Sequence, residues 1–263
     1  MTMTTSVTMP AVSAKAGYRE AVWSEWTKFR TVRSSVVTAA LLALVVPAFA
    51  VVVAATESLQ PDDTILGASV LGGAVLAQLL AASLGTVLIT GEFRSGTIRA
   101  TLAACPRRLT VLAAKATVAA ATVFAVTLPA GAAAFGIGVV MLDDDVYARG
   151  DGFPALLGIG LAMASLAVLG VGIGTIVRHS AGAVTTVVAI VLLPGLVAPL
   201  LGDAERWLGG ASLNGVLQKL SQSSDATDET VGSLGAWPSL LAVTAYTVAA
   251  VLGASWVLRH RDA

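Results

Sequence analysis

The residues best suited by type and spacing to bind a phosphate lie in the stretch GEFRSGTIRATL, from Gly91 to Leu102. A phosphate-binding P-loop has the pattern G-x-x-x-x-G-K-[ST], and its lysine reaches the phosphates. Gly91 and Gly96 have this spacing, but Thr97 stands in the lysine position and Ile98 follows it. The charge-neutralising lysine is missing, and the stretch follows an apolar segment rather than a buried strand. We therefore predict that this chain does not hydrolyse ATP by itself.

A second candidate group lies in residues 17–33, GYREAVWSEWTKFRTVR. As a helix, this segment has one apolar arc and an opposite side that is mostly basic and polar, which is typical of a helix lying in the headgroup layer of a membrane. Glu25 falls near the middle of the apolar arc, where a lipid-facing carboxylate would be costly. We expect Glu25 to pair with Lys28, three residues on, or with a basic group elsewhere in the protein. The arc consists of Tyr18, Ala21, Val22, Trp26, Phe29 and Val32.

Other chemistries find little support in the sequence. The single cysteine, Cys105, cannot form an internal disulfide, and the only histidines are His179 and His260. No Cys/His cluster has the spacing of a metal site, and no HExxH motif occurs. A membrane-embedded enzyme would need a nucleophile, a metal site or an acid–base pair, so we regard that class as disfavoured.

The elements that must position these residues are membrane helices. Hydrophobic residues make up 56% of the 263 residues and charged residues only 12%, which is far from the composition of a soluble domain. A helix needs roughly 20 apolar residues to cross a bilayer. Six windows without Asp, Glu, Lys, Arg or His meet this length, and they predict six spans: 36–55, 65–90, 116–142, 153–177, 181–201 and 237–258.

Charged residues are segregated between the two sides of these spans. The N-terminal region, the loop after the second span, the turn after the fourth and the C-terminus carry 13 of the 16 Lys and Arg residues. The other loops carry 12 of the 16 Asp and Glu residues. Basic loops face the cytoplasm. We therefore predict a multi-pass protein of the cell (plasma) membrane with both termini in the cytoplasm.

The charge-free spans bear on how transport could be driven. Ion-coupled carriers usually keep carboxylates, Lys or His within the membrane. Here Gln78 and scattered Ser and Thr are the only polar side chains at depth. If the chain transports a substrate, we expect the energy to enter from outside the membrane.

Proline and glycine mark irregular positions in the spans. Pro47 and Pro129 each remove a backbone hydrogen bond inside a span and favour a kink. In the fifth span, Pro194, Gly195 and Pro199 predict a helix that breaks near Pro194, with residues 196–208 turning back at the outer surface. Span four contains the pair Gly170 and Gly174, whose spacing allows close helix packing within the chain or between two chains.

The loop after the second span resembles the corresponding loop of ABC-2-type transporter permeases, the membrane subunits of ABC transporters. That family has an E-[FY]-R-x-G-T-[LIM]-x-x-x-L pattern, followed by P-x-R and by a lysine at the start of the third span. This chain has residues 92–99 (EFRSGTIR), then Thr101-Leu102, Pro106-Arg107 and Lys115. The segment Ser24-Glu25-x-x-Lys28 is similar to the family's amphipathic N-terminal segment. The resemblance covers essentially the whole chain.

The resemblance implies an all-α polytopic fold: an N-terminal amphipathic interfacial helix, a coupling helix between spans two and three, and short re-entrant outer helices between spans five and six. It also implies a separate ATP-binding subunit that binds ATP in place of this chain, and a second permease chain, identical or related. The implied ATPase-docking residues are Glu92, Arg94, Gly96, Thr97, Arg99, Glu25 and Lys28. Pro194, Gly195 and Pro199 would form a helix break that caps the exit.

The domain organisation that we expect is a disordered tail (1–16), an amphipathic helix (17–35) and a transmembrane domain (36–263) with a coupling loop (91–115) and an outer loop (202–236). The function that we expect is export of a hydrophobic small molecule or lipid-like compound, with membrane lipid but no nucleic acid as a further partner. A non-transporting scaffold or sensor subunit with the same architecture remains the alternative.

Overall fold

The computed structural model describes residues 17–56, 59, 62–105, 107–142, 145–202 and 205–260; the predicted tail, 1–16, and Pro106 lie outside them. The described residues form helices and connecting turns, without a strand. In chain order the helices are α1 (Tyr18–Thr31), α2 (Arg33–Thr56), α3 (Ile65–Leu71), α4 (Ala74–Ser95), α5 (Thr97–Ala104), α6 (Arg108–Met141), α7 (Gly152–Val177), α8 (Ser180–Val197), η1 (Ala198–Leu200), α9 (Glu205–Ala211), α10 (Leu213–Leu220) and α11 (Ala236–His260).

Six of these helices are long and apolar enough to cross a membrane: α2, α4, α6, α7, α8 with η1, and α11. Each overlaps most of one of the six predicted windows. The predicted all-α, six-span fold is therefore confirmed.

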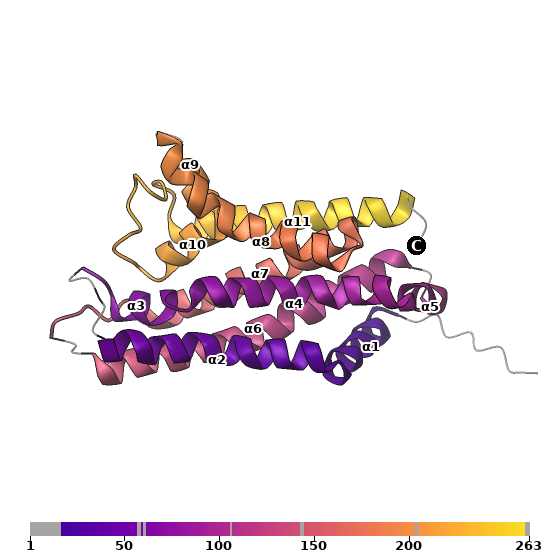
Figure 1. The fold of residues 1–263 in the computed structure, drawn as a ribbon, viewed down its shortest axis with the longest axis horizontal. Helices are drawn as coiled ribbons and strands as arrows, with labels where there is room; N and C mark the ends of the chain where they lie inside the picture. The colour runs from indigo at the N-terminus through magenta and orange to yellow at the C-terminus, as the bar shows by residue number, and fades with distance from the viewer. Residues whose placement is uncertain are drawn as a thin grey trace, which may run out of the picture.

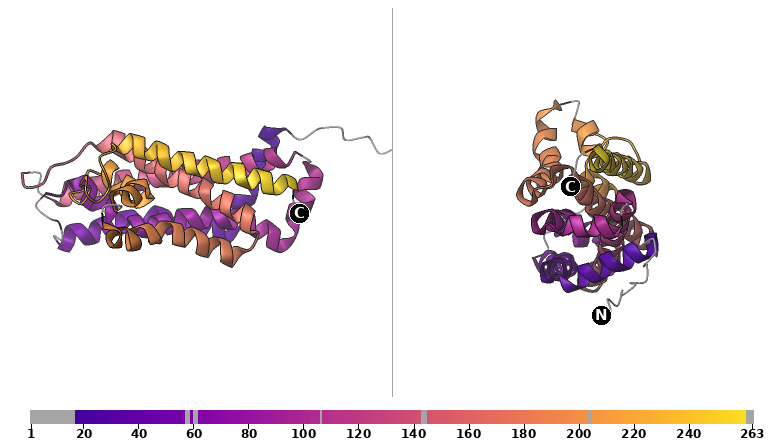
Figure 2. Two further views of the ribbon diagram at one scale, coloured as in Figure 1. Left: turned by 90° about the horizontal axis from the view of Figure 1, so that it is seen from above. Right: turned by 90° about the vertical axis from the view of Figure 1, so that its right-hand side faces the viewer.

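The long helices lie side by side in an elongated bundle (Figure 1). Helix α7 is the most buried of the six and packs on α4, α6, α8 and α11. Helix α1, helix α5 and the C-terminal end of α11 lie at one end of the bundle, which we call the α5 end. Helices α3, α9 and α10 lie at the other, which we call the α10 end, and Figure 2 shows the same separation from above.

Small residues let α4 and α7 approach almost to backbone contact. A Cβ atom on Gly85 would lie 1.9 Å from the carbonyl oxygen of Ala167, and one on Gly170 would lie 2.4 Å from that of Ala82. A Cβ on Gly174 would lie 2.6 Å from the side-chain Cγ2 of Ile89 and 3.2 Å from the carbonyl oxygen of Thr86. The glycine pair of the fourth span thus serves packing within the chain.

The second predicted span, 65–90, is divided into α3 and α4. Gly72 and Gly73 lie at the break, where each costs about 1 kcal/mol as a helical residue relative to alanine. A Cβ on Gly73 would lie 3.1 Å from the carbonyl oxygen of Val45 in α2. Close packing against α2 and poor helix propensity together explain a break that the apolar window did not reveal.

The second span has a break that we did not predict, whereas the fifth span lacks the break that we did predict. We expected a break near Pro194, but α8 continues through Pro194 to Val197 and then tightens into η1. Pro199 has no N–H to donate to the carbonyl of Gly195, so the α-helical ladder ends one turn later than predicted. Helices α6 and α2 likewise continue through Pro129 and Pro47.

The predicted coupling loop, 91–115, is largely helical. Helix α4 extends to Ser95, α5 occupies Thr97–Ala104, and α6 already begins at Arg108. A short helix is therefore present between spans two and three, where the resemblance implied one. The apolar windows underestimated the helices on either side because these end in charged residues.

Two short helices follow η1 in the predicted outer loop. Helix α10 buries Leu213, Val216, Leu217 and Leu220 against the bundle, with its closest neighbours on α7 and α11. The amide of Gln78, fully buried in α4, donates from Nε2 to Asn214 Oδ1 of α10 at 3.5 Å. The polar residue noted at depth in the second span thus helps to seat α10.

Candidate functional site

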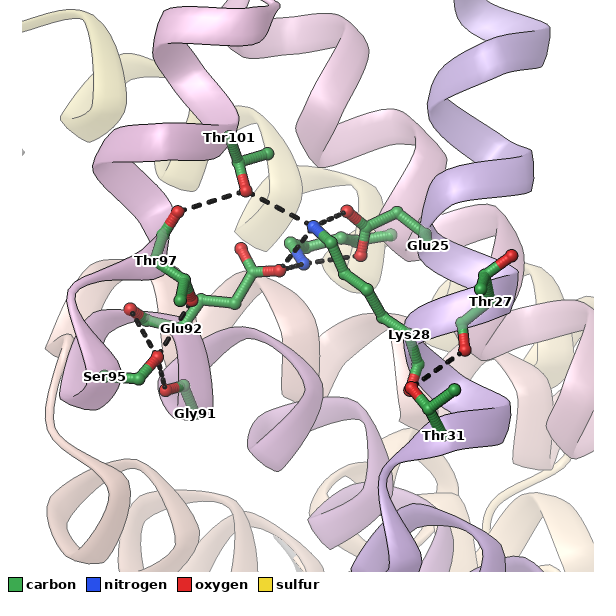
Figure 3. A network of polar contacts seen from close by, with 10 residues as sticks. Glu25, Thr27, Lys28, Thr31, Gly91, Glu92, Ser95, Thr97 and Thr101 are labelled. Atoms are coloured by element: carbon green, nitrogen blue, oxygen red, sulfur yellow. Dashed lines mark hydrogen bonds and ion pairs between the residues drawn. The ribbon is translucent and has the colours of Figure 1, made fainter.

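Two acidic and two basic side chains meet at the α5 end of the bundle. We call them the four-charge cluster: Glu25, Lys28, Glu92 and Lys115. Lys28 Nζ lies 2.7 Å from Glu25 Oε1 and 2.7 Å from Glu92 Oε1. Lys115 Nζ lies 2.6 Å from Glu25 Oε2 and 2.7 Å from Glu92 Oε1. Each lysine therefore bridges both carboxylates, and the cluster joins α1, α4 and α6 (Figure 3).

The predicted pairing of Glu25 is confirmed in both of its forms, since Glu25 binds Lys28 on its own helix and Lys115 on α6. Glu25 is buried with Phe29 on the face of α1 that contacts the bundle. Tyr18 Oη adds a second link to α6, at 2.6 Å from Thr117 Oγ1. The misfit in the apolar arc is thus the residue that attaches α1 to the bundle.

Three of the four side chains of the cluster are almost fully buried, and the fourth is partly exposed. The side chain of Lys115 is 1% exposed and those of Glu25 and Glu92 are 8% and 10% exposed, whereas that of Lys28 is 37% exposed. Charges taken out of water are tolerated when they are paired and hydrogen-bonded. Two acids and two bases give no net charge, and both oxygens of Glu25 and Oε1 of Glu92 accept lysine hydrogen bonds. Glu92 Oε2 is buried without a hydrogen-bond partner among the described residues.

Lys28 keeps its charge despite its partial burial. Burial alone would lower the pKa of Lys28, but hydrogen bonds to Glu25 and Glu92 outweigh it and raise the pKa above the ordinary value of 10.5. A raised lysine pKa contributes stability below the unfolded-state pKa and loses it only as the pH rises through the folded-state value. Lys28 therefore stays protonated across the neutral pH range, and its contribution to attaching α1 does not change there.

A sharp corner joins α4 to α5 directly beside the cluster. Gly96 forms it with a φ of 73°, in the left-handed region that glycine occupies without penalty. Ser95 Oγ donates to the carbonyl of Gly91 at 2.9 Å and lies 2.8 Å from Thr97 Oγ1. Lys28 Nζ reaches across to Thr101 Oγ1 of α5 at 3.3 Å, so the corner is tied to α1 as well.

The residue next to Glu92 receives a different contact. The guanidinium carbon of Arg178 lies 5.4 Å from the ring centroid of Phe93, in a cation–π arrangement. Arg178 forms the turn between α7 and α8. The end of α4 thereby contacts α1, α6 and this turn.

The implied docking residues divide into two groups in space. Glu25 and Glu92 are buried within the chain and face the lysines of the cluster, with Lys28 beside them. Arg94, Gly96 and Thr97 are exposed at the corner, and the side chain of Arg99 lies outside the described part of the chain. The structure thus brings together the two acids and Lys28 as an internal link, and leaves the others at the surface.

Lys115 is the member of the cluster that we did not count among the candidate site residues. It matched the motif lysine near the third span, but the predicted span began just after it. In the structure it lies two turns inside α6, where it is 2% exposed. A lone lysine inside an otherwise apolar helix is a usable signal, because such a residue needs an acidic partner.

The predicted exit residues line a hollow at the α10 end. Pro194, Gly195 and Pro199 border a cavity of about 380 Å³ whose wall also includes Glu205 and Asp225. A second cavity, of about 230 Å³, lies between α7, α8 and α11 and is mostly apolar, with Leu166, Leu169 and Tyr246 among its residues. Pro194 and Ser212 belong to the walls of both.

The arrangement of six spans, an amphipathic first helix and a helical corner carrying the EFRSGT motif can be compared with known families. A family model described as ABC-2 family transporter protein matches residues 21–195, which is more than half of the chain. The chain belongs to this ABC-2 family. It is a multi-pass membrane protein of a transporter family whose members generally work with an ATP-binding subunit.

The ABC-2 match ends within α8. It includes all four residues of the cluster and the α4–α5 corner, whereas α9, α10 and α11 follow it. A comparison with curated proteins finds no match. The family relationship therefore rests on the first five spans and on the α4–α5 corner.

We predict that Lys115→Met will destabilise this ABC-2 protein by about 3–5 kcal/mol, because it leaves each of two buried carboxylates without one of its two lysine partners. Thermal unfolding of the purified chain in detergent measures the loss. Arg30→Met, at an exposed position of α1, is the control. Adding Glu25→Gln to Lys115→Met should recover part of the stability; equal melting of Lys115→Met and wild type would contradict a stabilising cluster.

Gly96→Ala should destabilise the corner by about 1–2 kcal/mol, because the positive φ disfavours any Cβ. Gly91→Ala is the matched control, since Gly91 is helical, a Cβ there would meet nothing within 4 Å, and alanine should stabilise the helix by roughly 0.5–1 kcal/mol. Thermal unfolding of both variants tests the pair. A shift of the same sign in both would rule out strain at the corner.

Proposed function

We propose that this chain is the permease subunit of an ATP-driven exporter in the cell membrane, with both termini in the cytoplasm. The support for its orientation is that 13 of the 16 basic residues belong to four segments of the sequence. Helix α1, the α4–α6 connection, the α7–α8 turn and the end of α11 all lie toward the α5 end (Figure 1). The α5 end would accordingly face the cytoplasm.

The observation that carries the proposal is the α4–α5 corner fixed by buried charge. Helix α5 presents Thr97, Ala100 and Ala103 outward, on one face of small side chains, and Arg94 is exposed in the last turn of α4 just before it. Small residues allow a partner to approach the helix backbone closely. Helix α5 would act as the coupling helix, seated in a cleft of a separate ATP-binding subunit that binds ATP.

The roles of the seven implied docking residues follow from their burial. Arg94, Gly96 and Thr97 would contact the ATPase subunit, as would Arg99 of the same motif. Glu25, Glu92 and Lys28 would position the contact surface from inside, because they link α1 to α4 and α6. A push on α5 would then move these helices together, as rigid bodies.

A second permease chain would complete the pathway. Only 22% of the apolar window of α8 and 28% of that of α11 are buried within one chain. Helix α8 borders both cavities near the α10 end and α11 borders the mostly apolar one, and we expect part of this surface to face a second copy or a related chain.

The substrate would be a hydrophobic small molecule or lipid-like compound. The mostly apolar cavity beside α7 and the more polar cavity at the α10 end share Pro194 and Ser212. A substrate that moves outward would pass from apolar walls to walls that also carry polar and charged side chains. Pro194, Gly195 and Pro199 would form the exit.

Arg94→Glu should lower the yield of the complex with the ATP-binding subunit at least fivefold in co-purification, because it reverses an exposed charge beside α5. The melting temperature of the isolated chain should stay unchanged. Glu92→Gln should lower both the yield of the complex and the melting temperature of the isolated chain, because it disrupts the buried four-charge cluster. Arg30→Glu, on α1, is the charge-matched control.

Unchanged assembly and unchanged substrate-stimulated ATP hydrolysis in Arg94→Glu would count against docking through α5. Normal assembly of the wild-type complex without transport of any hydrophobic substrate would instead favour the scaffold or sensor subunit.

Gly195→Leu should reduce transport several-fold in reconstituted vesicles while ATP hydrolysis persists. A Cβ at Gly195 meets nothing within 4 Å, so the larger side chain can enter the cavity without straining the helix. Gly136→Leu is the matched control, because Gly136 is equally open but lies on the exposed side of α6. Equal transport by both variants and the wild type would exclude Gly195 from the exit.

A further inference from the structure

Three arginines surround a hollow at the α5 end that takes no part in the four-charge cluster or in the α4–α5 corner. The hollow has a volume of about 480 Å³ and lies between the start of α6 and the end of α11. Its walls are Arg107, Arg108, Leu109, Thr110 and Arg259. Neither Arg107 nor Arg259 has a carboxylate partner among the described residues, and both are exposed. The hollow therefore has a strongly positive lining.

Arg108 holds the two walls together. Its Nη1 donates to the carbonyl oxygen of Leu258, near the end of α11, where helix carbonyls lack partners within the helix. This contact joins the start of α6 to the end of α11. It also gives a hydrogen-bond donor to one of the last carbonyls of α11, which would otherwise repel an anion. Arg107 and Arg259 are then placed on either side of the seam.

The start of α6 adds to the positive character of the hollow. The helix ladder begins with Thr110 and Val111, whose N–H groups donate to the carbonyl of Arg107 at 2.9 and 3.4 Å. The N-terminal end of a helix carries a partial positive charge, and α6 is 34 residues long. Arginine also binds phosphate through two parallel hydrogen bonds. Together these features favour a phosphate group.

The position of the hollow indicates where that phosphate comes from. Trp256 lies three residues before Arg259 on α11 and is 61% exposed. Exposed tryptophan at the end of a spanning helix is typical of the headgroup level of a membrane. Leu109, 39% exposed, adds an apolar surface beside the arginines. Basic pockets between helices at this depth bind anionic lipid headgroups.

We propose that this three-arginine hollow binds the phosphate of an anionic phospholipid from the leaflet at the α5 end. The phosphate lies between Arg107 and Arg259, and the glycerol backbone and acyl chains leave along Leu109. The lipid bridges the start of α6, which carries Lys115 two turns on, and the end of α11. This assignment requires a membrane protein and does not depend on the ATP-driven mechanism.

The test uses the purified full chain in a neutral detergent, titrated with phosphatidylglycerol and, separately, with phosphatidylcholine of the same acyl chains. Native mass spectrometry counts the bound lipid. The test variant is Arg107→Gln/Arg259→Gln, which leaves Arg108 in place. The matched control is Arg19→Gln/Arg30→Gln, which removes two exposed arginines of α1 and changes the net charge equally.

We expect wild type and control to bind phosphatidylglycerol at least tenfold more tightly than phosphatidylcholine, and the test variant to lose this preference to within about twofold. The melting temperature without lipid should be the same in all three proteins. Arg107→Lys/Arg259→Lys should retain part of the preference, because the charge remains while the paired hydrogen bonds are lost.

Several outcomes would overturn the proposal. An unchanged preference in the test variant would exclude the hollow, and an equal loss in the control would indicate diffuse attraction to a basic surface. Displacement of the lipid by inorganic phosphate at equal concentration would assign the hollow to a soluble anion. A test variant that keeps its lipid but no longer co-purifies with the ATP-binding subunit would assign the arginines to a protein contact.

Discussion

The organisation of the α5 end follows from one constraint: charges removed from water must neutralise one another. Lys115 is buried in the bundle and needs carboxylates, which α1 and α4 supply within the described parts of the chain. Glu25 and Glu92 meet that need, and Lys28 completes the balance from α1. The positions of α1, α4 and α6 are thus set by charge neutralisation, because no one of these helices carries all four charges.

The same constraint explains why a sequence motif mixes internal and surface roles. Within six residues, Glu92 faces the lysines, Phe93 lies under Arg178, Arg94 faces outward, and Gly96 turns the chain. Consecutive residues of a helix point in different directions, so adjacent motif positions serve different neighbours. A motif of this kind is best understood from the direction of each side chain.

Much of the fold could be predicted from the sequence, because crossing a bilayer demands long apolar helices. The buried position of Glu25 was equally accessible, since helical periodicity placed a carboxylate on an apolar arc. The division of the second span could not be predicted in this way. It depends on the close packing of Gly72 and Gly73 against α2, which is a tertiary contact. Nor could the sequence show that Glu92 faces inward, because its partners lie 64 residues before it and 23 after it.

The near-contact of α4 and α7 has a consequence for where any substrate can travel. Backbone meets backbone at Gly85 and Gly170, so neither water nor a small ion fits between these two helices. The α4–α7 seam is therefore closed at these two levels, and the mostly apolar cavity lies on the other side of α7, toward α8 and α11.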